Sequence, residues 1–268
     1  MIIVEHYTSL IKSVCDMKEV LSVGKSGGEE LPQQNESDVD IFVFCSGIPD
    51  IQTRQAAIGK LGTVVSNMRL SESKGRFWGV CDFITLDGTE ICLMYFTISD
   101  MNDEIDFVLN GTRLDREGEY FYPTGRCATL LSMHVVCDKN GYIFAMKEKL
   151  SVYPQSLAEA LCKHHIGKIN NAEDFDRAVL RQDVLFYHST LERAIDHFLQ
   201  AMFALNFCFF PSRKRTFQFI EQFALKPRHC AERLIEVIEL GARPETLAQS
   251  YETWRMLCEE LAAMKVRP

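Results

Sequence analysis

Hydrophobic residues recur with different periods in the two halves of this chain. In residues 5–18 they have helical spacing, and helices are also predicted over residues 51–61 and from Ser99, a suitable N-cap. Short apolar runs typical of strands occupy residues 20–23, 38–45, 63–65, 77–86 and 89–97. This order predicts an α+β fold that begins with a mixed-sheet domain over residues 1–125.

From about residue 126 the pattern is helical to the end. Helices are predicted over residues 128–136, 143–150, 157–165, 172–207 and 213–222, and two more follow Pro227. Pro211 should end the longest one, because proline cannot donate the backbone hydrogen bond that a helix interior needs. The pattern therefore predicts an all-helical domain over residues 126–268.

Two aspartates share one side of a predicted strand. Successive strand side chains point to opposite faces, so Asp38 and Asp40 point one way while Val39 and Ile41 point into a core. Like charges on one strand face repel each other. A cation would offset this repulsion, and hard oxygen ligands suit Mg²⁺, which keeps waters and phosphates as its other ligands. The pair predicts a Mg²⁺ site, with two solvated acids as the alternative.

Upstream of this strand, a glycine-rich segment is predicted to form a turn. Glycines expose backbone N–H groups where a phosphate can lie, so Gly24, Lys25, Ser26 and Gly27 are candidate nucleotide-binding residues. Gly-Lys-Ser also ends a P-loop. That motif needs a glycine where this chain has Glu19, so a P-loop is rejected.

A third carboxylate is expected on a hairpin. Asp87-Gly88 between two apolar runs is a strong hairpin signal, which makes Glu90 the start of the second strand. Asp82, on the first strand, is the rival for this role.

These motifs resemble those of the nucleotidyltransferase superfamily, which includes DNA polymerase beta and the aminoglycoside and lincosamide nucleotidyltransferases. The family pattern is a Gly-Ser or Gly-Gly turn, an Asp-hydrophobic-Asp strand and a third carboxylate on a later strand, which favours Glu90 over Asp82. The chain departs from this pattern at Lys25, which separates Gly24 from Ser26.

The resemblance implies an enzyme that transfers a nucleoside monophosphate from an NTP to a hydroxyl group and releases pyrophosphate. Asp38, Asp40 and Glu90 would be catalytic and would hold Mg²⁺, and the helical domain would close over the nucleotide. Residues 138–154 and 206–214 also resemble segments of uncharacterised bacterial nucleotidyltransferases. The acceptor would be a small molecule, such as an aminoglycoside or lincosamide, or else a protein. The alternative is a non-catalytic module that binds a nucleotide or a partner, against which the intact acid pair argues.

Charge is distributed unevenly along the chain. Residues 1–126 contain 20 acidic and 11 basic residues, and the net charge of the chain is −8. This balance makes nucleic acid an improbable partner, because proteins that grip its backbone are basic. An acidic cleft would instead attract a cationic acceptor such as an aminoglycoside.

Basic residues and histidines supply further candidates. Arg213-Lys214-Arg215 opens a predicted helix, where positive charge opposes the helix dipole and an anion would relieve it. Lys214 is therefore a candidate ligand of the triphosphate, with a solvated surface cluster as the alternative. His164, His165, His188 and His197 are interpreted as packed or surface residues, because they form no metal-binding motif.

The cysteines and the apolar runs indicate the cellular compartment in which the protein is expected. The ten cysteines form no C-x-x-C pair, so they are interpreted as reduced, buried thiols and a zinc site is not expected. No apolar run approaches the ~20 residues of a membrane span, and the first residues show no signal-peptide pattern. A cytoplasmic protein with no membrane partner is expected.

Overall fold

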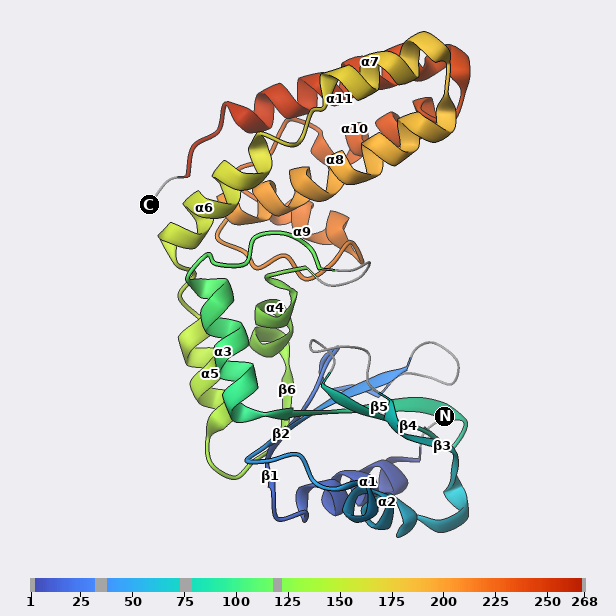
Figure 1. The fold of residues 1–268 in the computed structure, drawn as a ribbon, viewed down its shortest axis with the longest axis vertical. Coiled ribbons are helices and arrows are strands. Elements are labelled where there is room, and N and C mark those ends of the chain that lie inside the picture. The colour runs from blue at the N-terminus through green and yellow to red at the C-terminus, as the bar shows by residue number, and fades with distance from the viewer. Residues whose placement is uncertain (1–2, 32–37, 73–78, 118–121, 267–268) are drawn as a thin grey trace. The chain divides into compact units, whose positions relative to one another are not determined.

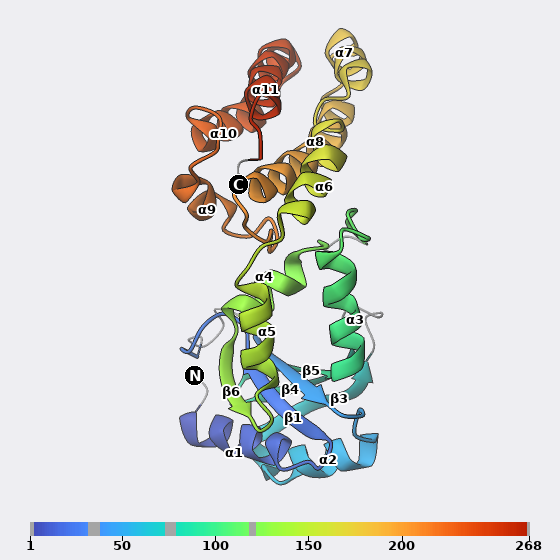
Figure 2. The same cartoon turned by 90° about the vertical axis from the view of Figure 1, so that its left-hand side faces the viewer.

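The computed structural model describes residues 3–31, 38–72, 79–117 and 122–266, and Figures 1 and 2 show it in two views. The chain divides into two compact units. Unit 1 consists of Met1–Asp106 and Arg126–Val152, and unit 2 consists of Phe107–Gly125 and Tyr153–Pro268. The α+β fold class is confirmed, because unit 1 contains a mixed sheet and the described elements of unit 2 are helices.

The described strands of unit 1 form one sheet in the order β3-β4-β5-β2-β1-β6. They are β1 (Val20–Lys25), β2 (Val39–Cys45), β3 (Val65–Glu72), β4 (Val80–Leu86), β5 (Thr89–Thr97) and β6 (His134–Asp138). β2 and β5 are parallel, and the other neighbouring pairs are antiparallel. Because β2 and β5 are parallel neighbours, their first residues lie at the same edge of the sheet.

Helices cover both faces of this sheet (Figures 1 and 2). One face carries α1 (Val4–Cys15) and α2 (Ile51–Gly59), and the other carries α3 (Ile98–Leu109), α4 (Gly125–Ser132) and α5 (Tyr142–Leu150). The alternation in β2 explains this arrangement. Val39, Ile41 and Val43 are buried in the core with α1 and α2, whereas Asp40 points to the opposite side, here called the acid face.

β6 was not predicted from the sequence. The helix expected over residues 128–136 is wrong, because α4 ends at Ser132 and His134–Asp138 pairs with β1. A short apolar run cannot be assigned to helix or strand by periodicity alone, and Val135 and Val136 are β-branched residues that favour a strand. Residues 126–152 consequently belong to the compact unit with the sheet, which differs from the predicted division at residue 126.

Unit 2 is built around a long central helix. Its helices are α6 (Gln155–Ile166), α7 (Ala172–Arg181), α8 (Val184–Leu205), α9 (Thr216–Gln222), α10 (Cys230–Leu240) and α11 (Leu247–Ala262). α8 contacts α6, α7 and α11. Trp254 of α11 is fully buried beside Phe198 of α8, with ring centroids 5.2 Å apart, and its Nε1 donates a hydrogen bond to the Ile169 carbonyl at 3.1 Å.

Two predicted helix boundaries are also wrong. The helix expected over residues 172–207 is two helices, because Gln182 adopts a left-handed conformation with φ of 52° and Asp183 caps α8 by accepting a hydrogen bond from the Phe186 N–H. α3 is capped by Thr97 rather than Ser99, since the Asp100 N–H donates to the Thr97 hydroxyl oxygen at 3.0 Å.

Several smaller expectations can be compared with the structure. The strand predicted at 63–65 is wrong at its first two residues, because Gly62–Val64 is a 3₁₀ turn and β3 begins only at Val65. Hairpin positions 77 and 78 lie outside the described residues. All ten cysteines are free thiols, but Cys137 and Cys208 are only partly buried, which differs from the expectation that all are buried. Within the described ranges, no helix has both the length and the apolar character needed to cross a membrane.

Candidate functional site

The predicted acids lie at the shared edge of the two parallel strands. Asp40 belongs to β2, and Asp38 immediately precedes that strand. The first registered pair is Val39 with Ile91, so Asp38 and Glu90 each lie one residue before it on neighbouring strands. Neighbouring strands are about 4.8 Å apart, and residues in parallel register point to the same face. Asp38, Asp40 and Glu90 therefore share the acid face.

The three acids differ in exposure and partners. Asp38 is exposed and Asp40 is half-buried. The Glu90 side chain is 49% exposed, and its Oε2 accepts a hydrogen bond from Nη2 of Arg69 at 3.2 Å. In the part of the chain that the structure describes, no three or more His, Cys, Asp or Glu side chains are arranged to hold a metal ion. The acids thus share a face without forming a closed ligand set.

Asp82, the rival third acid, lies on the opposite face. It pairs with Leu93 across the hairpin, and its carboxylate accepts hydrogen bonds from Arg54 Nη1 at 2.6 Å and from the Ser71 N–H at 2.8 Å. Burial raises the pKa of Asp82, although the Ser71 and Arg54 contacts oppose this rise. Because Arg54 belongs to α2, Asp82 is part of the core under α1 and α2 and does not join Asp38 and Asp40.

Gly24 and Lys25 lie in β1 rather than in the predicted turn. A Cβ on Gly24 would lie 2.1 Å from Met133 Sδ, so a side chain here would force Met133 to move. Lys25 pairs with Ile41 and therefore points away from the acid face, where its Nζ donates to the carbonyls of Ser26 and Glu30. Burial lowers the pKa of Lys25.

The glycine-rich turn itself begins at Ser26. The Ser26 N–H donates to the carbonyl of Asp40 at 3.0 Å, which fixes the turn beside the acidic strand. Gly27 and Gly28 follow with φ of 77° and 88°, values that favour glycine, and nothing lies within 4 Å of the position of a Cβ on either. The roles of Ser26 and Gly27 in nucleotide binding stay predictions.

Arg126 is a residue of this site that sequence reasoning missed. It lies in α4 and is 4% exposed, with its guanidinium carbon 4.9 Å from the ring centroids of both Phe42 and Phe96 on the acid face. Burial lowers its pKa to about 10, and the negative charges of Glu104 and Asp40 oppose this shift. A buried cation therefore stands near the acid pair. The sequence carries no motif around residue 126 that would have identified it.

Lys214 belongs to unit 2 and is exposed, just before α9. Its neighbour Arg213 is engaged within unit 2, because its Nε donates to Asp196 at 2.6 Å and to the Tyr122 hydroxyl at 3.1 Å. Arg116 also donates to Asp196 at 2.6 Å. One member of the basic triplet is thus part of a structural ion-pair cluster, and the proposed role of Lys214 stays a prediction.

A family model described as a domain of unknown function (DUF4037) matches residues 122–215. No curated protein matches the chain. Among solved structures, the chain is similar to a nucleotidyltransferase-like protein from Exiguobacterium sibiricum, with a TM-score of 0.48 and 9% identity over 96% of this chain and 73% of that chain. A likeness at this level carries no conclusion about activity.

Proposed function

We propose that this protein is a nucleotidyltransferase that moves a nucleoside monophosphate from an NTP to a hydroxyl group of a small-molecule acceptor. The observation that carries the proposal is the acid face, where Asp38, Asp40 and Glu90 lie at the starts of two parallel neighbouring strands. The turn that begins at Ser26 supports it, because the Ser26 N–H binds the Asp40 carbonyl and so keeps the glycines next to the acids.

The chemistry of the acid pair fits Mg²⁺. Carboxylates are hard oxygen ligands, and the exposure of Asp38 leaves room for the waters and phosphate oxygens that Mg²⁺ usually retains. Asp38 and Asp40 would hold the ion, and Glu90 would join them after leaving Arg69. When bound, Mg²⁺ would neutralise charge on the triphosphate and on the departing pyrophosphate.

In the proposed reaction, an acceptor oxygen forms a bond to the α-phosphorus of the NTP. The bond from that phosphorus to the bridging oxygen breaks, and pyrophosphate leaves. The alternative role of Glu90, instead of joining the metal ion, is to take the proton of the acceptor hydroxyl during the attack, which its half-exposed carboxylate permits. The exposed backbone of Gly27 and Gly28 would lie along the β- and γ-phosphates. The negative charge of the acid face would favour a cationic acceptor.

A second candidate is a protein that binds a nucleotide or a partner without turnover. The ion pair between Arg69 and Glu90 favours it, because a carboxylate that is already neutralised is a poorer base and a poorer metal ligand. The two candidates differ in one observable, which is the release of pyrophosphate.

The test is calorimetry of NTP binding with Mg²⁺ and with EDTA, followed by a pyrophosphate-release assay with an acceptor screen read by mass spectrometry. Asp40→Asn should weaken Mg²⁺-dependent binding by at least about tenfold and abolish turnover, with an unchanged circular dichroism spectrum. Asp16→Asn is the matched control, since Asp16 is an exposed acid at the end of α1. Wild-type affinity and turnover in Asp40→Asn would contradict the proposal, and binding without pyrophosphate release would favour the second candidate.

A further inference from the structure

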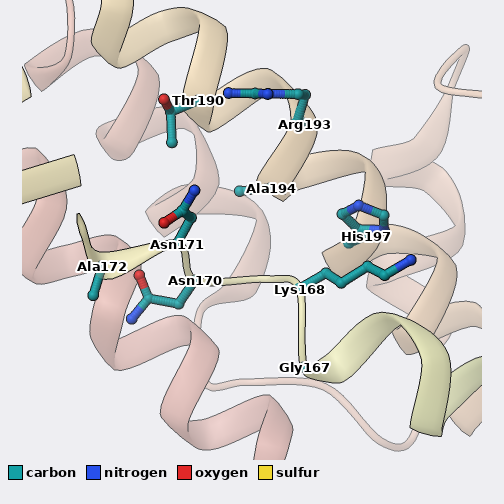
Figure 3. A pocket seen from close by; sticks show the side chains of 9 residues that line it. All are labelled: Gly167, Lys168, Asn170, Asn171, Ala172, Thr190, Arg193, Ala194 and His197. Carbon is teal, nitrogen blue, oxygen red and sulfur yellow. The ribbon is translucent and has the colours of Figure 1, made fainter. Parts of the chain in front are cut away.

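Unit 2 contains a pocket of about 420 Å³ that is unrelated to the acid face (Figure 3). One wall is the connection between α6 and α7, from Gly167 to the start of α7 at Ala172. The other wall is one face of α8, which contributes Thr190, Arg193, Ala194 and His197 at helical spacing. This volume falls in the range of pockets that hold small organic ligands.

The walls of this pocket carry hydrogen-bond donors and no acidic side chain. The lining includes the side chains of Lys168, Arg193 and His197 and the amides of Asn170 and Asn171, although the Asn171 amide already donates to Asp174 at 2.7 Å. None of the nine lining residues is Asp or Glu, although the chain as a whole has a net charge of −8. Such a wall is suited to a ligand with several acceptor oxygens and negative charge, since charge-assisted hydrogen bonds are the strong ones.

Arg193 has the greatest freedom to meet such a ligand. Its side chain is 64% exposed, its Nη2 lies 3.9 Å from Asp174, beyond hydrogen-bond distance, and its Nε donates to the Ser189 carbonyl at 3.2 Å. In Figure 3 the Arg193 side chain extends toward Thr190. Lys168, by contrast, is already engaged, because its Nζ donates to Asp115 at 3.3 Å and lies 2.9 Å from His164.

His197 is held in one tautomer by a buried histidine. Its Nδ1 lies 2.9 Å from Nδ1 of His165, so one of the two nitrogens must donate and the other accept. Burial, followed by the charge of His197, lowers the pKa of His165 to about 3, so this ring is neutral. His165 Nε2 is buried with no partner among the described residues. A proton there would be a buried donor without an acceptor, so we assign the proton of His165 to Nδ1, which then donates to His197.

This tautomer has a consequence for the pocket. His197 accepts at Nδ1, and burial lowers its pKa, so its single proton sits on Nε2. The ring that lines the pocket therefore supplies a neutral N–H donor. Thr190, on the same wall, is 2% exposed, and its hydroxyl oxygen is buried beneath the pocket surface, so the donors available to a ligand are those of Arg193 and His197.

We propose that this pocket is a binding site for a small phosphoryl anion, either inorganic phosphate or a phosphate monoester. Arg193 would supply the charged contact, and His197 Nε2 would supply a neutral donor from the same helix. A tetrahedral phosphoryl group has enough acceptor oxygens to meet donors from both walls at once, whereas a carboxylate has only two. The site is independent of the proposed nucleotidyl transfer.

The test is calorimetric titration of the full chain with inorganic phosphate and with glycerol 3-phosphate, at constant ionic strength and with EDTA. Without divalent metal the acid face repels phosphate, so binding there does not interfere. Arg193→Gln should weaken binding by about tenfold. Arg177→Gln is the matched control, because Arg177 lies on α7, 51% exposed and also 3.9 Å from Asp174, but does not line the pocket.

The effects of the two arginine substitutions decide whether the pocket binds phosphate. Saturable phosphate binding that is weakened by Arg193→Gln and is unchanged in Arg177→Gln supports the site. Tighter binding of the monoester than of inorganic phosphate identifies the ligand as a phosphate monoester, and tighter binding of inorganic phosphate identifies it as free phosphate. The proposal is overturned by equal effects of the two substitutions, by the absence of saturable binding at ~10 mM phosphate, or by acetate that competes as strongly as phosphate.

Discussion

Replacing Asp82 with Asn should destabilise unit 1 strongly, whereas replacing Glu90 with Gln should barely affect its stability. The two changes are chemically matched, since each converts a carboxylate on the β4–β5 hairpin into an amide. Their surroundings differ completely. Asp82 and its partner Arg54 have side chains that are 0% and 3% exposed, whereas Glu90 and Arg69 are 49% and 51% exposed.

The magnitudes follow from this difference in burial. Asn at position 82 can still accept the hydrogen bond from the Ser71 N–H, but it leaves the Arg54 guanidinium buried without its counter-charge. Removing one partner of a buried ion pair costs about 3–5 kcal/mol. A solvent-exposed pair such as Glu90 with Arg69 contributes only about 0–1 kcal/mol. The two variants should therefore differ by about 2–5 kcal/mol in the free energy of unfolding.

Hydrogen exchange of the β4 and β5 amides measures this free energy within unit 1, and urea unfolding followed by circular dichroism gives an independent value. The double variant Arg54→Met with Asp82→Leu should regain most of the loss, because an apolar pair often replaces a buried ion pair without cost. Glu90→Gln should lower turnover while leaving NTP affinity largely intact. A stable Asp82→Asn protein that has lost turnover, beside a fully active Glu90→Gln protein, would refute the assignment of the two acids.

Three further outcomes are expected. Gly24→Ala should lower the free energy of unfolding by about 1–3 kcal/mol, because the new Cβ would meet Met133 Sδ. Met133→Ala should relieve part of this loss, and additive effects of the two substitutions in a double-mutant cycle would contradict the clash. Burial alone would raise the pKa of Asp196, but its contacts with two arginines and a tyrosine lower it overall. The stability that Asp196 contributes is therefore present above its unfolded pKa of about 3.9 and is lost as pH falls through its lower folded value. Asp196→Asn should accordingly flatten the decline in melting temperature on acidification, and an unchanged profile would exclude this role. Lys214→Ala should weaken NTP binding by about tenfold to a hundredfold and leave NMP binding unchanged, as measured by calorimetry, and equal weakening would return Lys214 to a solvated surface role.

Features of the fold that are encoded locally could be predicted from the sequence. The β4–β5 hairpin follows from Asp87-Gly88, whose φ values of 50° and 83° are those of a turn that favours these residues. The shared direction of Asp38 and Asp40 follows from the two-residue period of a strand alone. The boundary between α7 and α8 was also encoded locally, because Asp183 is a good N-cap, but the apolar periodicity continues across it.

Features that depend on pairing between distant segments could not be predicted in the same way. The sequence left Glu90 and Asp82 as rivals, and the parallel register of β5 with β2 decides which of them shares the face of Asp40. Asp82 is held by Arg54, a residue 28 positions earlier in α2, and no local pattern links the two.

Gly24 shows that a glycine can be required for its small size rather than for its conformational freedom. A glycine before an acidic strand predicts a turn, because conformational freedom is the commonest reason for a glycine. Here Gly24 is a strand residue, and its missing side chain makes room for Met133, which follows α4 just before β6. The pairing of β6 with β1 therefore also explains the glycine at position 24. Because β6 pairs with β1 at Gly24, the return of the chain to the sheet after α4 favours a small residue there, and the positive φ angles typical of a glycine turn are found only at Gly27 and Gly28 of this segment.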